Sequence, residues 1–246
     1  MAAHTSRELA ELHMHRLWSG SGGIAELVAR DKRDPVEVAA ILQAIKDGKT
    51  FGWLRDRRSE DPDHLLYQWQ NLYLELGLKV DISNLKIPAP EPGFTRLILI
   101  PEGMTPNKAF ALLKKKTQAW KYTDNLDTIT SIRDTKKTYV IWVRDRQEAD
   151  EELKNKSADD LKRDGVNCIT LIERLLYELK FFTETLQGGQ AGKHLDEKNW
   201  TLCAGSRFQD GSVPYMDWVP DDGGVGVGWG YADSRFESMR SRVVVS

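Results

Sequence analysis

The C-terminal segment, residues 201–246, restricts the possible structures of this chain more than any other part. It contains seven glycines and no lysine, whereas all eighteen lysines precede it. Within it, the run Val-Gly-Val-Gly-Trp alternates a large side chain with a hydrogen atom. Successive side chains of a β-strand point to opposite faces, so this run predicts a strand that displays Gly226 and Gly228 on one face. The side chains expected on the core face are Val225, Val227 and Trp229.

Helical periodicity dominates the first part of the chain. Apolar side chains recur at intervals of three or four residues, and two of the segments begin with Asp-Pro and end at glycine. These patterns predict helices over residues 6–18, 23–30, 34–47 and 61–76. We expect a small helical module over residues 1–87, whose expected role is docking or the joining of copies of the chain into a homo-oligomer. Three prolines then predict a linker over residues 88–93, because proline forces extended geometry on the residue before it.

Residues 94–246 mix strand and helix patterns, which predicts an α+β fold for this second domain. Short apolar runs bounded by turn residues predict strands, and longer runs of helical period predict helices. The expected helices are residues 105–113, 148–153 and 170–183. The expected strands are residues 94–100, 138–143, 200–204, 225–229 and 240–245.

Charge and composition exclude several classes of protein. The chain carries 35 basic and 37 acidic residues and is 40% hydrophobic, which is typical of a folded globular protein. This balance disfavours a protein that grips nucleic acid through its phosphates. No apolar run approaches the roughly 18–20 residues that span a bilayer, and no signal-peptide core is found, so the expected location is the cytoplasm. There Cys168 and Cys203 are expected to be reduced.

No motif in the sequence predicts catalysis, a metal or a cofactor. His13 and His15 are two residues apart on a helix and therefore point in different directions. The acidic residues 148–152 are typical of a helix start. Basic and aromatic side chains interleave over residues 114–122, which we interpret as a solvated helix end rather than a nucleic-acid site. The glycine-rich residues 223–228 lack the strand–turn–helix context of a nucleotide site.

Several segments of the second domain together resemble one known family. They are Trp-Thr-Leu-Cys-Ala-Gly-Ser-Arg at 200–207, Asp-Gly-Ser-Val-Pro at 210–214, Val-x-Val-x-Trp at 225–229 and the last eight residues. Over about residues 94–246 the chain resembles the variable proteins of diversity-generating retroelements. The resemblance implies a C-type-lectin-like domain of the formylglycine-generating-enzyme type. It also implies that a reverse transcriptase mutates template adenines and rewrites a variable region over about residues 207–240.

The missing lysines agree with that implied mechanism. An AAC codon altered at both adenines can encode Tyr, Phe, Ser, Asp or Gly among others, but it cannot encode Lys, Gln, Glu, Met or Trp. The residues that this reasoning expects at a ligand are Phe208, Ser212, Tyr215, Asp217, Gly226, Gly228, Gly230, Tyr231, Ser234, Phe236 and Ser238. Those expected to form the scaffold are Trp200, Trp218, Trp229, Arg240 and Arg242.

These observations predict a non-catalytic protein that binds an unknown target, a protein or another macromolecule, through its C-terminal loops. Two related functions remain as alternatives. One is a copper oxidase of the formylglycine-generating type, which binds the metal through two nearby cysteines, whereas Cys168 and Cys203 are expected to lie far apart. The other is a lectin. The sequence lacks the triplets by which calcium-dependent lectins bind sugars, which leaves a calcium-independent one.

Overall fold

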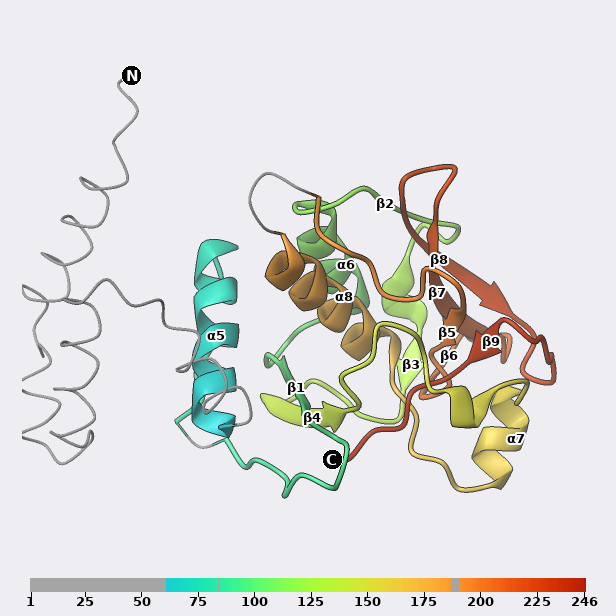
Figure 1. Cartoon of the computed structure of the whole chain (residues 1–246), viewed down its shortest axis with the longest axis horizontal. Helices are drawn as coiled ribbons and strands as arrows, with labels where there is room; N and C mark the ends of the chain where they lie inside the picture. Colours follow the sequence, from blue (N-terminus) through green and yellow to red (C-terminus); the bar gives the residue numbers. More distant parts are fainter. Residues whose placement is uncertain (1–60, 84, 187–190) are drawn as a thin grey trace, which may run out of the picture. The chain divides into compact units, whose positions relative to one another are not determined.

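The structure is a computed structural model that describes residues 61–83, 85–186 and 191–246 (Figure 1). The chain divides into two compact units, residues 1–59 and 60–246. The helices expected over residues 6–18, 23–30 and 34–47 fall outside the described residues, and so does the oligomer contact expected of them. Among the described residues, no helix is long and apolar enough to cross a membrane.

The second unit mixes helices and strands, which confirms the α+β prediction in outline. Its helices are α5 (Pro62–Glu75), α6 (Pro106–Lys114), α7 (Ala158–Arg163) and α8 (Leu171–Thr185). A five-stranded sheet contains β2 (Ala119–Lys121), β5 (Trp200–Leu202), β7 (Val213–Val219), β8 (Gly224–Gly230) and β9 (Met239–Arg240). Two smaller pairs join β1 (Arg96–Ile100) to β4 (Tyr139–Val143), and β3 (Thr130–Ser131) to β6 (Ser206–Arg207).

Side chains at the helix starts explain where the main helices begin. The Thr170 side chain accepts a hydrogen bond from the backbone N–H of Glu173, and the Glu173 carboxylate accepts one from the backbone of Thr170. This reciprocal capping box satisfies two backbone donors that a helix start leaves free. At the start of α6 the Thr105 side chain accepts a single bond from the backbone N–H of Lys108, and Pro106 occupies the first position, where a missing N–H costs nothing.

Helix α5 belongs to the second unit, not to an N-terminal module. The indole Nε1 of Trp69 donates to the carbonyl of Leu97 at 2.8 Å, and the Tyr73 hydroxyl donates to the carbonyl of Leu99 at 2.6 Å. The four residues from Trp69 to Tyr73 rise about 6.0 Å along the helix, and the two residues from Leu97 to Leu99 rise about 6.6 Å along the strand, so the spacings match. α5 therefore covers the edge of β1 that does not pair with β4, as its place in Figure 1 indicates. The boundary expected at residues 88–93 is wrong.

Two elements are shorter than the sequence predicts. The helix expected over residues 148–153 is a single 3-10 turn, because the buried Asp150 carboxylate faces Arg144 instead of capping a helix. The terminal strand expected over residues 240–245 is β9 alone. Beyond it, Val243 bridges to Cys168 and Val245 bridges to Trp142. Because these residues pair singly with two different segments, they form no continuous ladder.

The five-stranded sheet has the order β2-β8-β7-β5-β9, with β7 and β8 forming a long antiparallel hairpin. β2 runs parallel to β8 at one edge. Helix α8 packs against α6, β1 and β7, so it covers one face of the sheet. On the other face, Ala158 of α7 packs with Leu202 and Val213 at the β5 end. The β2–β8 end of that second face carries the candidate site.

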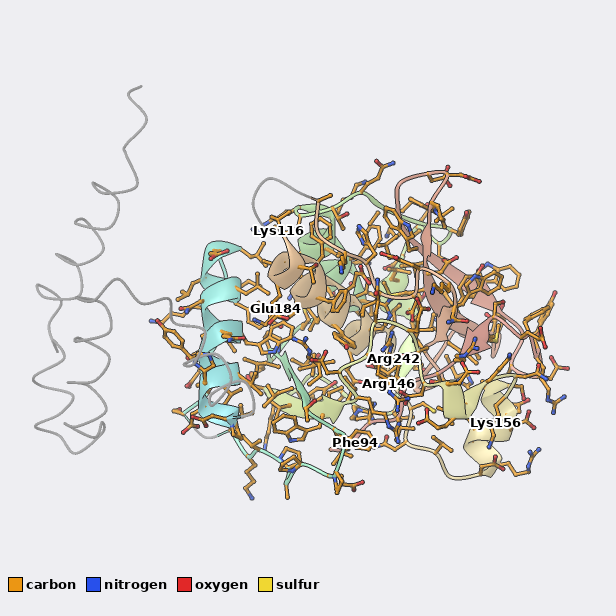
Figure 2. The ribbon with its side chains drawn as sticks, in the orientation of Figure 1. Phe94, Lys116, Arg146, Lys156, Glu184 and Arg242 are labelled. Atoms are coloured by element: carbon orange, nitrogen blue, oxygen red, sulfur yellow. The ribbon has the colours of Figure 1, made fainter. Side chains whose placement is uncertain are left out.

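A buried group of charged side chains joins α8 to the end of the chain. Arg174 donates to Glu178 at 2.8 Å and to Asp196 at 2.7 Å, and Arg242 donates to the second oxygen of Asp196 at 2.7 Å. Each of these side chains is 1% exposed or less. Arg242 also donates to the carbonyl of Arg146, beside which it lies in Figure 2. Buried charges are stable only when paired in this way, so the network fixes the C-terminal segment.

Candidate ligand-binding face

Strands β7 and β8 carry different side chains on their two faces. Met216 points to the core and is fully buried. On the opposite face Tyr215 pairs with Gly228, and Asp217 pairs with Gly226. Residues directly opposite in an antiparallel pair share a face. The Tyr215 phenol therefore lies beside Gly228, and the Asp217 carboxylate lies beside Gly226; neither glycine has a side chain.

Both glycines are covered by neighbouring side chains. A Cβ on Gly228 would lie 2.4 Å from Cζ and 2.6 Å from the hydroxyl oxygen of Tyr215. A Cβ on Gly226 would lie 3.2 Å from Oδ1 of Asp217 and 3.4 Å from Nε1 of Trp120. The glycines lie on the expected face, but the prediction that they are displayed is wrong, because both are buried beneath these groups. Their function is to leave room for the side chains above them.

Aromatic rings extend from Tyr215 across the sheet. Trp200 of β5 stacks on Tyr215 with ring centroids 5.0 Å apart and planes at 12°. Phe236 follows, its centroid 6.3 Å from that of Trp200. In the other direction lie Trp120 of β2 and, one residue beyond that strand, Tyr122, which is 70% exposed. We call this surface the aromatic face and define it by Trp120, Tyr122, Trp200, Tyr215, Asp217 and Phe236.

Asp217 is the charged group of this face, and it has no partner. Its side chain is half-buried, and no hydrogen bond or ion pair joins it to any residue in the described part of the chain. Burial raises the pKa of its carboxyl to about 6, an effect opposed by Arg174 and reinforced by Asp196. Burial also raises the pKa of Tyr215, with smaller contributions from Asp217 and Tyr122. The carboxylate can therefore accept hydrogen bonds from a ligand.

Of two residues expected at a displayed surface, Ser212 is buried and Phe208 is half-buried. Ser212 is 6% exposed, and its backbone N and hydroxyl both donate to the Asp210 carboxylate, at 2.9 and 2.6 Å. Phe208 is half-buried and packs against the main core. The prediction for Ser212 is wrong because residues 208–212 form a tight turn, in which the Phe208 N–H donates to the Ser212 carbonyl and the Gly211 N–H to that of Phe208.

The remaining expected ligand residues lie after the end of β8 or at its last position. Tyr231 and Phe236 are 68% and 51% exposed. The half-buried members of the set are Gly230, Ser234 and Ser238. Of these residues, the described contacts bring Phe236 onto the aromatic face through Trp200.

Trp229 is exposed, contrary to the prediction that it packs in the core. It is 46% exposed and meets Tyr231 edge to face, with ring centroids 5.9 Å apart. Val225 and Val227 precede it on the same face and are buried as expected. The alternation is correct, but the strand runs past the core before it reaches Trp229. Trp229 and Tyr231 form a second exposed aromatic pair.

The other scaffold candidates occupy different environments. Trp218 stacks on His194 with centroids 3.9 Å apart, and Arg240 is buried and donates to Glu151 at 2.7 Å. Trp200 belongs to the aromatic face, whereas the sequence predicts only a scaffold role for it. Trp120 and Tyr122 are members of this face that the sequence analysis does not predict, although their alternation around Lys121 is a strand signal.

Both cysteines are buried thiols. The Gly205 N–H donates to the carbonyl of Ile169 at 3.0 Å, so the backbone segments next to Cys168 and Cys203 are neighbours. Their side chains nevertheless belong to separate core clusters, and burial raises the pKa of each thiol. This disfavours the thiolate, the form that binds metals. In the described ranges, no group of three or more His, Cys, Asp or Glu side chains could hold a metal ion.

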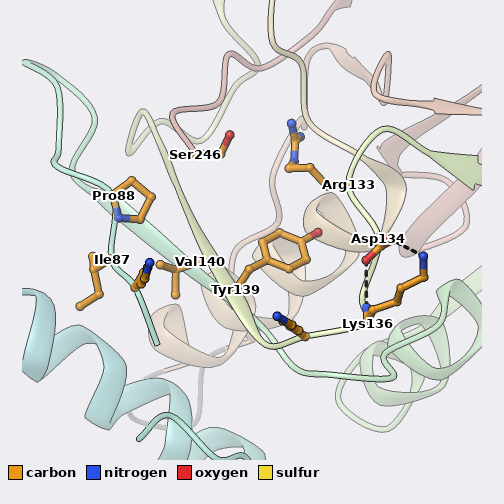
Figure 3. A pocket seen from close by; sticks show the side chains of 10 residues that line it. Ile87, Pro88, Arg133, Asp134, Lys136, Tyr139, Val140 and Ser246 are labelled. Carbon is orange, nitrogen blue, oxygen red and sulfur yellow. Dashed lines mark hydrogen bonds and ion pairs between the residues drawn. The ribbon is translucent and has the colours of Figure 1, made fainter. Parts of the chain in front are cut away.

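A separate pocket of about 700 Å³ has four basic side chains among its lining residues, next to apolar ones and Asp134 (Figure 3). Two of its cations already have partners. Arg133 donates to Glu173 at 2.6 Å, and Lys136 lies 3.2 Å from Asp134. Only long, flexible side chains then remain to hold an acidic ligand, which makes this pocket a weaker candidate than the aromatic face. Its lysines without a partner among the described residues are Lys86 and Lys137.

Comparisons with protein families, with curated proteins and with solved structures give no match. The features that indicate a function are therefore the geometry of the aromatic face and the sequence of the tail.

Proposed function

We propose that this protein is a non-catalytic binding protein that holds a macromolecular target against the aromatic face. One observation carries the proposal: a row of partly exposed rings crosses four strands and surrounds a carboxylate without a partner. Tyr and Trp offer large contact areas with few rotatable bonds, and so bind at a small cost in side-chain entropy. Aromatic side chains are also enriched among the residues that dominate binding energy at interfaces.

The surroundings of the aromatic face make it rigid enough to bind without rearrangement. The Tyr215 ring stacks on Trp200 and covers Gly228, whose missing side chain leaves room for it. Beneath the sheet, Met216 is fully buried, and the paired charges of Arg174 and Asp196 are inaccessible to solvent. A surface that is already ordered loses less entropy when a target binds.

The proposal extends to the fold and to the origin of this surface. The order β1, α6, α8 and then a mixed sheet built on the antiparallel β7–β8 hairpin supports a C-type-lectin-like domain. Along β7, Tyr215 and Asp217 lie on the open face and can be encoded by altered AAC codons, whereas Met216 and Trp218 lie on the other face and cannot. This alternation supports diversification by a retroelement, since open-face positions tolerate substitution far better than core positions.

The two alternative functions have less support. A copper oxidase would need thiolates, and burial of both cysteines opposes their ionisation. A calcium-independent lectin would also use aromatic rings and a carboxylate, so it shares the aromatic face with the favoured function. The two differ in the ligand, a sugar in one case and a protein in the other.

Binding to defined peptides tests the proposed site. Peptides are selected from a random library on the whole protein, and their affinities are measured by fluorescence anisotropy. We expect the double variant Trp200→Ala, Tyr215→Ala to lose at least about tenfold in affinity, which corresponds to about 1.4 kcal/mol. Tyr67→Ala is the matched control, because Tyr67 is 59% exposed on α5 and lies outside the aromatic face. Unchanged affinity in the double variant would contradict the proposal.

A further inference from the structure

We propose that Asp217 receives an arginine side chain of the target, with the guanidinium group lying beside Trp120 and Tyr215. This inference rests on the proposed function and specifies the chemistry of its ligand. It begins from the position of the carboxylate, which is half-buried on an otherwise aromatic surface.

The environment of Asp217 differs from that of the other buried carboxylates. Asp196 is shared by two guanidinium groups, and Asp150 accepts from Arg144 at 2.7 Å. Asp217 has lost part of its hydration and gained no donor in the described part of the chain. A partly dehydrated charge without a partner is unfavourable, and a cation supplied by a ligand would relieve this cost. The site is therefore complementary to positive charge.

The rings around Asp217 favour a planar cation. Oδ1 of Asp217 and Nε1 of Trp120 lie 3.2 and 3.4 Å from the same point, the position of a Cβ on Gly226. Because that side chain is missing, no group of β8 separates the carboxylate from the indole. Tyr215 is near enough on the other side for the Asp217 charge to raise its pKa. A guanidinium group can accept both environments, since it binds a carboxylate with its edge and stacks on rings with its face.

The other charged groups near Asp217 do not remove the preference of this site for a cation. Arg174 and Asp196 lie behind the sheet and are paired with each other, so their effects on Asp217 oppose one another. Tyr215 flanks the site, and because burial raises its pKa it stays neutral at physiological pH. The carboxylate, whose pKa is about 6, is largely ionised above neutral pH, and arginine binding should strengthen as the pH rises from 5 to 7.5.

The test uses two small probes of nearly the same shape, N-acetyl-arginine amide and its neutral ureido analogue N-acetyl-citrulline amide. Each is titrated into the full-length protein while the indole N–H signals of its eight tryptophans are followed by NMR. Trp120→Phe and Trp200→Phe assign the two signals of the aromatic face. We expect the arginine probe to shift the Trp120 signal saturably, and to bind at least about tenfold more tightly than the citrulline probe.

Variants separate this inference from a general charge effect. Asp217→Asn should weaken arginine binding at least about tenfold, and its unchanged indole spectrum without ligand would establish that it folds. Asp221→Asn is the control, because Asp221 is an exposed carboxylate just beyond β7. Equal binding of the two probes, or full binding by Asp217→Asn, would overturn the inference. If selected peptides without cations still required Tyr215, the proposed function would stand while this inference failed.

Discussion

One added methyl group tests the packing on which the aromatic face depends. Gly228→Ala would place a Cβ 2.4 Å from Cζ of Tyr215, whereas carbon atoms in contact are about 3.5–4.0 Å apart. The backbone of Gly228 is outside the left-handed region, so alanine itself fits. The ring must instead move by more than about 1 Å and lose its stacking on Trp200, worth about 0.5–1.5 kcal/mol.

The expected net effect combines three contributions. Besides the stacking, the displaced ring of Tyr215 loses about 1 kcal/mol of burial, and alanine regains about 0.5–1 kcal/mol over glycine in a strand. We therefore expect Gly228→Ala to destabilise the protein by about 1 kcal/mol. In the Tyr215→Ala background the obstruction is gone, and the same change should stabilise the protein by about 0.5 kcal/mol.

The coupling between Gly228→Ala and Tyr215→Ala is expected to be about 1.5 kcal/mol. It is measured by urea unfolding of the wild type, the two single variants and the double variant. Gly230→Ala is the matched control, since it lies in the same strand and its Cβ would meet nothing within 4 Å. It should be neutral or slightly stabilising. Equal effects of Gly228→Ala with and without the Tyr215 ring would refute the packing described above.

Three further predictions concern other parts of the molecule. Asp196→Asn should cost about 3–5 kcal/mol in urea unfolding, because it leaves two buried guanidinium groups without their shared charge; a loss below about 1 kcal/mol would contradict this role. Tyr73→Phe leaves the buried Leu99 carbonyl without its donor and should cost about 1–2 kcal/mol, whereas Tyr67→Phe at an exposed site should change stability by less than about 0.5 kcal/mol. The folded-state pKa of Asp217 is raised from 3.8 to about 6, so its ionisation disfavours the folded state, and stability should fall as pH rises through this window. Asp217→Asn should remove that slope in urea unfolding between pH 4 and 7; an unchanged slope would count against the assignment.

The sequence predicted the elements whose signals are local. The start of α8 follows from Thr170 and Glu173, which cap it, and the start of α6 from Thr105 and Pro106. The strand around Val225 follows from its alternation with glycine. In each case the deciding contacts lie within a few residues along the chain, so composition and spacing suffice.

The features that the sequence failed to predict depend on contacts between distant segments. The Pro-rich residues 88–93 resembled a linker, but Trp69 and Tyr73 bind the carbonyls of β1 and bring α5 into the second unit. The glycines of β8 resembled displayed positions because their covering residues, Tyr215 and Trp120, come from two other strands. The alternation of side chains along a strand predicts which face each residue lies on. It does not predict which side chains of other strands cover that face, or where along the strand the core ends.

Sequencing sibling alleles of the gene tests the central claim most directly, namely that the aromatic face is a binding surface rewritten by a retroelement. Substitutions should concentrate at open-face positions such as Tyr215 and Asp217, and should spare Met216 and Trp218. Gly228 should change only where Tyr215 has become a smaller residue, because their atoms compete for the same space. Substitutions spread evenly over the gene, or concentrated at buried positions, would contradict the account.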